Sequence, residues 1–334
     1  MIFQNADFHN VAELVENKER GGYRILRIPQ ALVDKLNKNA QGSAYFTCGC
    51  ELRFNLHSEE AVLYLRRDPC NPDIMPYGIA EVWQGNHQGR FQLSPQPVGQ
   101  DKTAIRIRKQ NNSDLKLLYP AKRDLFDPEL YRVFLPYDWG HAIYGIDGEI
   151  SLPTKEQVPE KTLLCYGSSI THGGGVSAPS ASYAHLLSTK LGMDLRNVGM
   201  AGAAHMDPAM ADYICQEAWD MATLELGINV LHWELSEFEQ KTRSFITKIA
   251  KTHPDRPVYC ISLFTSCADY NKTEQVREMR NIIRQIVEEL HLPKLHYIDG
   301  SKCLTSLNGL SSDALHPSNT GMAEIAEYLY QKIH

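Results

Sequence analysis

The chain has 334 residues, of which 43% are hydrophobic and 22% are charged, and its formal net charge is −6. This length favours two domains, each with enough apolar material for its own core. The absence of a Lys/Arg-rich run excludes the electrostatic footprint of a nucleic-acid-binding protein, and the mildly acidic balance disfavours an anionic membrane surface. We therefore expect neither nucleic acid nor membrane as a partner.

The first twenty residues, MIFQNADFHNVAELVENKER, indicate the compartment. Asp7, Glu13 and Glu16 interrupt any apolar stretch, and there is no basic start or small-residue cleavage site of a signal peptide. No apolar run approaches the length of about 18 residues that a transmembrane helix needs. These features predict a cytoplasmic protein, in which the eight cysteines are thiols.

The first part of the chain has the pattern of β-strands. Hydrophobic and polar residues alternate over residues 51–56, 61–66, 104–108 and 130–135, which predicts half-buried strands. Only residues 30–37 suggest a short helix. Strands without long helices predict an antiparallel sandwich or jelly-roll domain over residues 1–150. The polar segment 151–160, with two prolines, is the predicted linker.

From about residue 160, short apolar runs alternate with helical patterns. The expected strands are 162–166, 195–198, 221–226, 257–263 and 294–298. Each is followed by an expected helix, at 182–191, 207–216, 237–251, 273–291 and 319–333. Such strand–helix units predict a parallel sheet covered on both faces, which makes residues 161–334 a three-layer α/β/α domain.

The stretch YGSSITHGGG (166–175) follows the first of these strands, and ligands of parallel sheets gather at the carboxyl ends of the strands. A phosphate-binding loop would need GxxxxGK[ST] or GxGxxG, and neither is present. A serine-capped helix start is the structural alternative. The third interpretation is a nucleophilic serine, which needs a base, a group that orients the base, and donors for an oxyanion.

The ends of later strands supply these groups. Gly202 follows the second strand and could offer a backbone N–H, and Asn229 follows the third strand and could donate its side-chain amide. Asp313 and His316 follow the fifth strand, three residues apart, where the carboxylate can hold Nδ1–H of the imidazole while Nε2 faces a serine. Pro317 disfavours helical geometry at His316 and fits a helix that starts just beyond it.

These blocks, in this order, resemble the SGNH (GDSL-like) hydrolase superfamily over residues 161–334. The first block is Gly167-Ser168-Ser169-Ile170-Thr171, in which Ser168 stands where the superfamily commonly has Asp. In the third block, Val230 stands where Asp is often found. The resemblance implies a flavodoxin-like sheet with strand order 2-1-3-4-5. The strand-rich first domain is similar to the jelly-roll domains that precede some esterases and acyltransferases of this superfamily.

The resemblance also implies a role for each residue. Ser169 is the nucleophile, His316 the general base, and Asp313 the residue that orients His316. The N–H groups of Ser169 and Gly202 and the amide of Asn229 form the oxyanion hole. This chemistry needs no cofactor, and because the histidines show no ligand spacing on one face, we expect no metal site.

Other residues near these blocks have less specific signals. His205 and Trp233 are candidates for lining the substrate site, with surface exposure or packing as the alternative. Trp83, Tyr137 and Trp139 are interpreted as sandwich core rather than as a sugar-binding platform. Gly173, Gly174 and Gly175 remove side-chain bulk after the nucleophile, which favours a small or open acyl site.

Together these features predict a serine esterase that hydrolyses short acyl esters, in particular acetyl esters, of a saccharide or small metabolite. The same triad would serve an acyltransferase, in which an alcohol replaces water. A non-catalytic carbohydrate-binding protein and a nucleotide-binding protein are the alternatives of a different class. The expected partner is a small acylated substrate, and homo-oligomerisation is left open.

Overall fold

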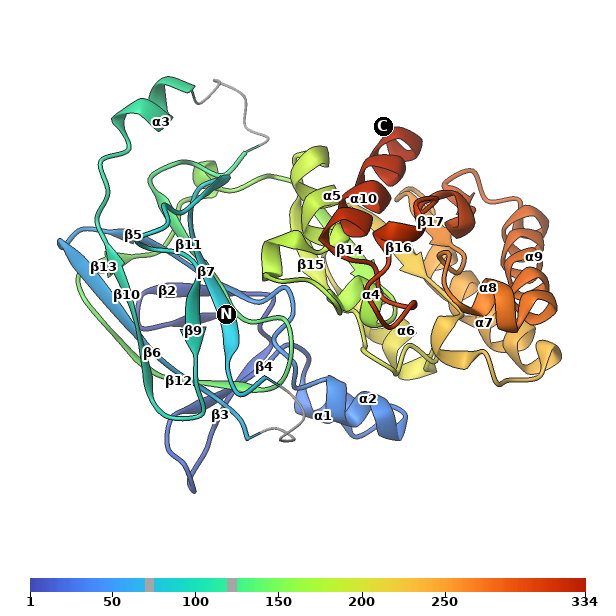
Figure 1. Ribbon diagram of the computed structural model, residues 1–334, viewed down its shortest axis with the longest axis horizontal. Helices are drawn as coiled ribbons and strands as arrows, with labels where there is room; N and C mark the ends of the chain where they lie inside the picture. Colours follow the sequence, from blue (N-terminus) through green and yellow to red (C-terminus); the bar gives the residue numbers. More distant parts are fainter. Residues whose placement is uncertain (70–74, 119–124) are drawn as a thin grey trace.

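Two antiparallel sheets make up most of the N-terminal half in the computed structural model, which describes residues 1–69, 75–118 and 125–334 (Figure 1). The first sheet contains, in spatial order, β1 (Ile2–Phe3), β2 (Ala6–His9), β5 (Glu51–Leu56), β11 (Leu130–Phe134), β7 (Gly78–Gln84) and β8 (His87–Gln88). In addition, β13 (Ile150–Ser151) pairs with β5, and β9 (Gln96–Val98) pairs with β7. The second sheet contains β10 (Thr103–Arg108), β6 (Glu60–Arg67), β12 (His141–Asp147), β4 (Tyr23–Leu26) and β3 (Glu13–Glu16).

The apolar faces of these two sheets share one core. Phe8, Leu52 and Phe54 of the first sheet pack in the same buried cluster as Leu63 and Ile105 of the second. The predicted strands are found as β5, β6, β10 and β11, and the predicted jelly-roll-like β region is confirmed. The sequence did not reveal β12, because a register shift between Ile143 and Gly145 interrupts its alternation.

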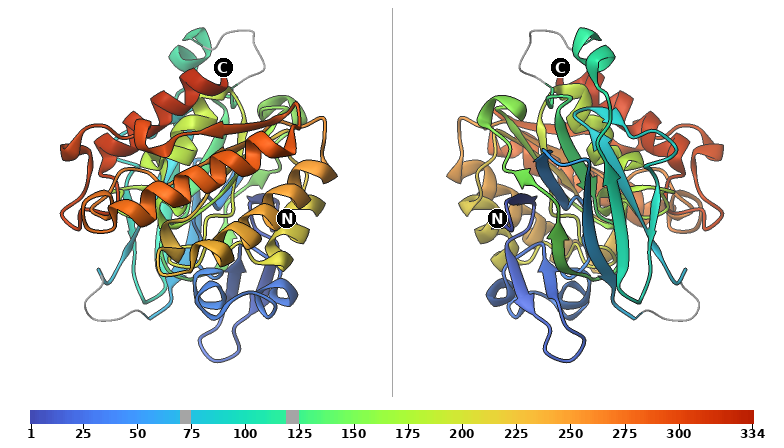
Figure 2. Two further views of the ribbon diagram at one scale, coloured as in Figure 1. Left: turned by 90° about the vertical axis from the view of Figure 1, so that its right-hand side faces the viewer. Right: turned by 90° about the vertical axis from the view of Figure 1, so that its left-hand side faces the viewer.

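The C-terminal half contains the predicted parallel sheet, with strands in the order β15 (Asp194–Asn197), β14 (Thr162–Tyr166), β16 (Met221–Glu225), β17 (Val258–Ile261) and β18 (Leu295–Ile298). In chain order this is 2-1-3-4-5, as expected. Helices α5 (Tyr183–Leu191) and α10 (Asn319–Ile333) pack together and contribute to the core on one face. Helices α6 (Pro208–Gln216), α7 (Leu235–Thr252) and α9 (Thr273–Leu290) contribute to the core on the other face (Figures 1 and 2).

The segment expected as one helix over 30–37 is instead two short helices, α1 (Gln30–Val33) and α2 (Lys38–Ser43). Asn37 separates them, because its side chain accepts a hydrogen bond from Ala40 N and caps α2. Val33, Leu36 and Ala40 belong to the core cluster of the parallel-sheet half, and Figure 1 shows α1 and α2 beside that half. The division into residues 1–150, 151–160 and 161–334 stays a prediction.

The expectation of half-buried strands was wrong for β5 and β11, where nearly every residue is buried. Glu51, Arg53 and Arg132, on the polar side of these strands, are 2%, 2% and 5% exposed. Arg53 reaches Asp194 on β15, so the polar face of the first sheet lies against the parallel-sheet half. The alternating pattern of β5 and β11 therefore corresponds to two buried faces of the sheet, one apolar and one ionic.

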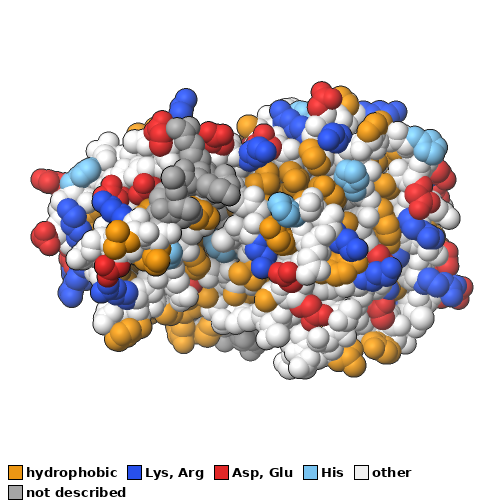
Figure 3. All heavy atoms as spheres, turned by 90° about the horizontal axis from the view of Figure 1, so that it is seen from above, with side chains coloured by type: hydrophobic (Ala, Val, Ile, Leu, Met, Phe, Trp, Pro, Cys, Tyr) orange, Lys and Arg blue, Asp and Glu red, His pale blue; other side chains and the backbone are white. Residues whose placement is uncertain are grey.

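The outer surface carries charges of both signs. Acidic and basic side chains are interspersed over the face drawn in Figure 3. Among the described residues, no helix combines the length and the apolar character needed to span a bilayer. The described cysteines are free thiols, and Cys70 lies outside the described residues. The cytoplasmic location stays a prediction.

Candidate functional site

The turn after β14 places Ser169 at the carboxyl edge of the parallel sheet. Ser168 caps the short helix α4 (Ser169–His172), because its hydroxyl accepts a hydrogen bond from Ile170 N at 3.1 Å. Ser169 is thus the first residue of a helix that begins directly after a buried strand. Its side chain is partly exposed, whereas Gly167 and Ser168 on one side and Ile170 on the other are buried.

His316 and Asp313 come to the same edge from the loop after β18. His316 Nε2 lies 2.7 Å from Ser169 Oγ, and His316 Nδ1 lies 2.6 Å from Asp313 Oδ2. Because a carboxylate only accepts, Nδ1 carries the proton and Nε2 is free to accept from the serine hydroxyl. The structure therefore brings together the three residues that the sequence singles out as the candidate triad.

The Asp313 carboxylate is held in a tight turn. Its Oδ1 accepts hydrogen bonds from Leu315 N, His316 N and Ser311 Oγ at 2.9, 2.9 and 2.7 Å. The limited burial of Asp313 acts to raise its pKa, but the hydrogen bonds from His316 and the neighbouring donors lower that pKa well below its usual range. Asp313 is therefore ionised at neutral pH and keeps the imidazole in the tautomer that the serine needs.

Two of the three glycines at 173–175 lie against the loop that carries His316. A Cβ at Gly174 would stand 3.1 Å from His316 Cδ2, and a Cβ at Gly175 would stand 2.9 Å from Pro317 O. Gly173 and Gly175 also have positive φ angles of 111° and 92°, which favour glycine. The close approach of the His316 loop to α4 thus explains Gly174 and Gly175, and the small or open acyl site that the sequence suggested stays a prediction.

Gly202 and Asn229 flank this edge from the loops after β15 and β16. Gly202 has a φ of 66° and is exposed, with no atom close enough to contact a Cβ there. Asn229 Oδ1 accepts a hydrogen bond from Ala204 N at 3.0 Å, which orients the amide and leaves Nδ2 to donate elsewhere. This hydrogen bond joins Asn229 to the loop that carries Gly202, and the role of both residues as oxyanion donors stays a prediction.

Glu225, which the sequence analysis missed, lies against the turn that carries Ser169. This buried residue ends β16, and its Oε2 accepts from Ser168 N at 2.6 Å and Thr171 Oγ1 at 3.1 Å. A Cβ at Gly167 would lie 2.5 Å from this oxygen, so glycine is needed there. Burial raises the pKa of Glu225, against the hydrogen bonds from Ser168 and Thr171. The sequence did carry one signal for Glu225, which is an acidic residue at the end of the otherwise apolar strand MATLE.

Asn197 also holds the turn in place, and its role could not be read from the sequence. Its Nδ2 donates to Thr171 O at 2.8 Å, and its Oδ1 accepts from Gly199 N at 2.8 Å. One side chain therefore joins α4 to the loop that carries Gly202. The N-terminal half supports this residue, because Asn10 Nδ2 and Arg27 Nη1 both donate to Asn197 O.

The other predicted residues have mixed outcomes. His205 and Trp233 are partly exposed and contact one another edge to face, with ring centroids 5.6 Å apart. Whether they line a substrate site stays a prediction. Trp139 does not belong to the sandwich core. It is partly exposed at the junction of the two halves, where its ring stacks on Phe46.

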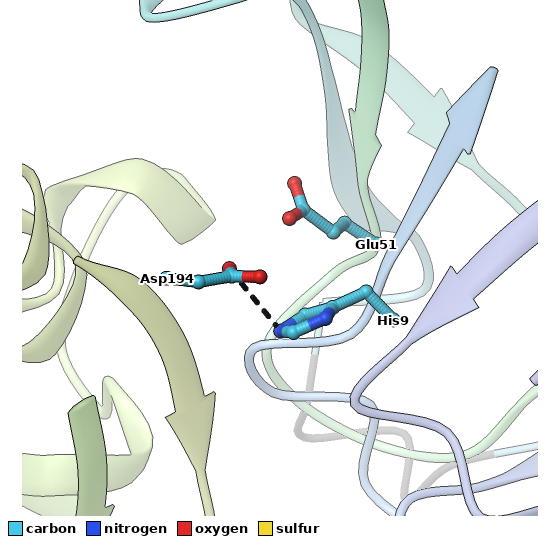
Figure 4. A group of neighbouring side chains, drawn as sticks. All are labelled: His9, Glu51 and Asp194. Carbon is cyan, nitrogen blue, oxygen red and sulfur yellow. Dashed lines mark ion pairs between the residues drawn. The ribbon is translucent and has the colours of Figure 1, made fainter. Parts of the chain in front are cut away.

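His9, Glu51 and Asp194 form the group of side chains whose geometry comes nearest to a metal site among the described residues (Figure 4). The guanidinium of Arg53 already donates to both carboxylates, and Arg132 donates to Glu51 at 3.0 Å. Burial would raise the pKa of Asp194, but the charge of Arg53 holds that pKa well below its usual range. These arginines supply the positive charge that a metal would bring, so the group joins the two halves as an ion-pair network.

Comparison with known proteins places the chain in a family. The model of the GDSL-like lipase/acylhydrolase family matches residues 160–334, the part that carries the serine, the oxyanion candidates and the aspartate–histidine pair. The chain belongs to the GDSL-like lipase/acylhydrolase family. No curated protein matches the chain by sequence.

Solved structures extend the similarity to the whole chain. A salicylyl-acyltransferase from a tetracycline biosynthetic pathway has a TM-score of 0.81 at 18% identity, covering 99% of this chain and 94% of its own. A GDSL-like lipase structure from Bacteroides ovatus has a TM-score of 0.69 at 18% identity, covering 98% and 96%. A family two carbohydrate esterase from Clostridium thermocellum has a TM-score of 0.63 at 14% identity, covering 86% and 92%. At these identities the likeness is one of fold, and it includes the antiparallel β region.

Proposed function

We propose that this GDSL-like acylhydrolase is a serine esterase that removes short acyl groups, in particular acetyl, from a saccharide or small metabolite through an acyl-enzyme. The observation that carries the proposal is the continuous chain of hydrogen bonds from Asp313 through His316 to Ser169. Such a chain supplies a nucleophile, a general base and a group that orients the base.

The proposed reaction has two steps. Ser169 Oγ attacks the acyl carbon while its proton moves to His316 Nε2, and the tetrahedral intermediate collapses as His316 returns that proton to the leaving alcohol. Water then attacks the acyl-enzyme and gives its proton to His316. The carbon–oxygen bond to Ser169 breaks, the serine regains its proton, and the carboxylic acid is released. Asp313 keeps the imidazole oriented and stabilises its charged form throughout.

Three donors are proposed for the oxyanion: the N–H groups of Ser169 and Gly202, and Nδ2 of Asn229. The first lies at the start of α4, the second is on an exposed glycine, and the third is oriented by the bond from Ala204 N to Asn229 Oδ1. Donors that are fixed before the reaction stabilise the developing charge without reorganising.

Glu225 is proposed as a positioning residue for this machinery, because it holds Ser168 N and Thr171 Oγ1 from below. Glu225→Ala would leave both donors without their acceptor, which costs about 1–3 kcal/mol per buried group. Glu225→Gln keeps an acceptor oxygen. We expect the alanine variant to lose mainly kcat and the glutamine variant to recover most of it. Equal activity of the alanine variant and the wild type would contradict this role.

An acetylated saccharide as the substrate is supported by the fold shared with family two carbohydrate esterases and with an acetyl xylan esterase. The test is a series of esters of one alcohol with acyl chains from acetyl to decanoyl, together with acetylated saccharides. We expect kcat/KM to be highest for acetyl and to be higher for acetylated saccharides than for simple alkyl acetates. A preference for long acyl chains would contradict the proposal.

Acyl transfer to an alcohol is the second candidate, and the structural similarity to a salicylyl-acyltransferase over 99% of the chain favours it. Both reactions share the same acyl-enzyme, so they differ only in what attacks it. The measurement is the ratio of transfer product to free acid when sugar or alcohol acceptors are added. A ratio that stays low at high acceptor concentration would indicate an esterase.

A further inference from the structure

A groove of about 670 Å³ lies where the N-terminal half meets the Gly202 loop. Arg24, Tyr45, Phe46, Asp68 and Trp139 line it from the N-terminal half, and Ala201 and Gly202 line it from the other. Its volume is within the range of small-molecule sites. Because Gly202 borders this groove and is also a proposed oxyanion donor, one side of the groove adjoins the proposed oxyanion hole.

One wall of the groove is aromatic. The rings of Phe46 and Trp139 stack with centroids 5.4 Å apart and an interplanar angle of 21°. Trp139 Nε1 donates to Pro69 O at 2.8 Å, which fixes the indole, and both rings are only partly buried. On its other side, Phe46 meets the ring of His172 edge to face at 5.5 Å, and His172 ends the helix that Ser169 begins. This wall therefore packs, through His172, against the helix that begins at Ser169.

The opposing polar groups are an arginine and an aspartate. Arg24 Nη2 lies 2.9 Å from Asp68 Oδ2, and Arg66 Nη1 holds the other carboxylate oxygen at 3.0 Å. The Arg24 guanidinium lies over the Tyr45 ring, 4.1 Å from its centroid. The Arg24 side chain is still 36% exposed, so donors remain available to a ligand. A paired donor and acceptor at fixed spacing matches the hydroxyl groups of a sugar.

Glycines keep the groove open. Gly42 on α2 and Gly202 both line it, and no atom lies within 4 Å of a Cβ built at either position. At Gly140 the reason is different, since a Cβ there would lie 2.6 Å from Asp68 Oδ2. Gly42 therefore offers a position where a side chain can be added into empty space without disturbing the fold.

We propose that this groove binds the alcohol portion of the ester, and that this portion is a saccharide ring. The apolar face of the ring would stack on the Phe46–Trp139 wall while its hydroxyls bond to Arg24 and Asp68. The proposal rests on the proposed esterase function and names its leaving group. It gives the N-terminal half a direct part in substrate recognition, through residues that lie far apart in the sequence.

The test uses the full chain with Gly42→Trp, which fills the groove, and Gly42→Ala as the matched control. Two substrates are compared, a mono-O-acetylated methyl glycoside and vinyl acetate, whose small leaving group does not reach the groove. We expect Gly42→Trp to lower kcat/KM for the glycoside at least tenfold, since a misfit of even one methylene in a pocket changes kcat/KM by about 10–200-fold. The value for vinyl acetate should stay within about twofold of the wild type. Gly42→Ala should match the wild type on both.

Equal losses on both substrates, no loss on either, or a loss confined to vinyl acetate would overturn the groove proposal. Binding separates this proposal from the esterase function. Isothermal titration of the methyl glycoside into the wild type and Gly42→Trp should show binding only to the wild type. Such binding without any vinyl acetate turnover would overturn the esterase function and leave the groove assignment standing. Turnover without glycoside binding would overturn the groove assignment alone.

Discussion

The two halves of this molecule bring their candidate functional residues together in different ways. In the parallel-sheet half, Ser169, Gly202, Asn229 and His316 each follow the carboxyl end of a strand, so the topology alone brings them to one edge. In the antiparallel half, the residues that line the groove come from β4, from the segment after α2, and from loops of the second sheet. The arrangement in the parallel-sheet half can be predicted from the sequence, whereas the residues of the groove come together only through tertiary packing.

The interface between the halves shows the same contrast. The polar side of β5 carries Glu51 and Arg53, which an isolated strand would expose to water. Here Arg53 bonds to Asp194, and His9 Nε2 lies within 3.4 Å of the same carboxylate. Charged residues that would face water on an isolated strand thus form a buried ionic contact between the halves. This indicates that each half contributes to the stability of the other.

The largest expected effect is a loss of kcat that is not accompanied by a loss of folding stability. His316→Ala removes the proposed base, and by analogy with other triads it should lower kcat about 10⁴-fold or more. His316 is partly exposed, so the free energy of unfolding should change little. Ester turnover and urea unfolding at pH 7 measure the two quantities. Near-normal turnover would remove His316 from the mechanism.

The next prediction concerns the interface. Asp194→Ala leaves Arg53 short of a buried partner, and breaking a buried pair typically costs about 3–5 kcal/mol. Asp212→Ala is the matched control, because it removes an exposed partner of Lys248 and should cost less than about 1 kcal/mol. Urea unfolding compares the two variants. Equal stabilities would show that the ion-pair network does not hold the halves together.

Asn229→Asp sharpens the account of the oxyanion hole. The substitution keeps an oxygen that can accept from Ala204 N, but it replaces the Nδ2 donor by a negatively charged acceptor. We expect kcat to fall by about 10²–10³ or more, with KM changed much less. A loss confined to KM would assign Asn229 to substrate binding instead.

The smallest expected effect is a change in the pH dependence of folding stability, and it again concerns the interface between the two halves. Burial lowers the pKa of His185 to about 3, and this ring lies against Trp83 and Phe134 of the first sheet. The unfolded state takes up a proton near pH 6.5 and the folded state does not, so stability is full above pH 6.5 and falls as the pH drops toward 3. Between pH 7.5 and 5.5 this one histidine should account for about 1.4 kcal/mol.

His185→Phe removes the titration while retaining an aromatic ring of similar shape. The variant should therefore lose about 1.4 kcal/mol less than the wild type when the pH falls from 7.5 to 5.5. Urea unfolding at both pH values measures this difference. Identical pH dependence in the two proteins would mean that His185 has the same pKa in the folded and unfolded states, and would contradict this prediction.

Much of the fold and of the candidate site could be predicted, for identifiable physical reasons. The stripe Val276, Met279, Ile283 and Ile286 predicted α9, and the Asp313–His316 spacing predicted a contact within one turn. Glu225 and Asn197 were missed because each acts through hydrogen bonds to residues 26–57 positions away. The groove was missed because Arg24, Phe46 and Trp139 share no local pattern.

The most direct test of the central claim is the intact mass of the protein after treatment with a serine-reactive fluorophosphonate, for the wild type and Ser169→Ala. Turnover of p-nitrophenyl acetate is read alongside. An activated Ser169 predicts one adduct on the wild type, no adduct on the variant, and turnover that disappears with the adduct. A wild-type protein that forms no adduct and turns over no ester would contradict the claim that Ser169, His316 and Asp313 form a working triad.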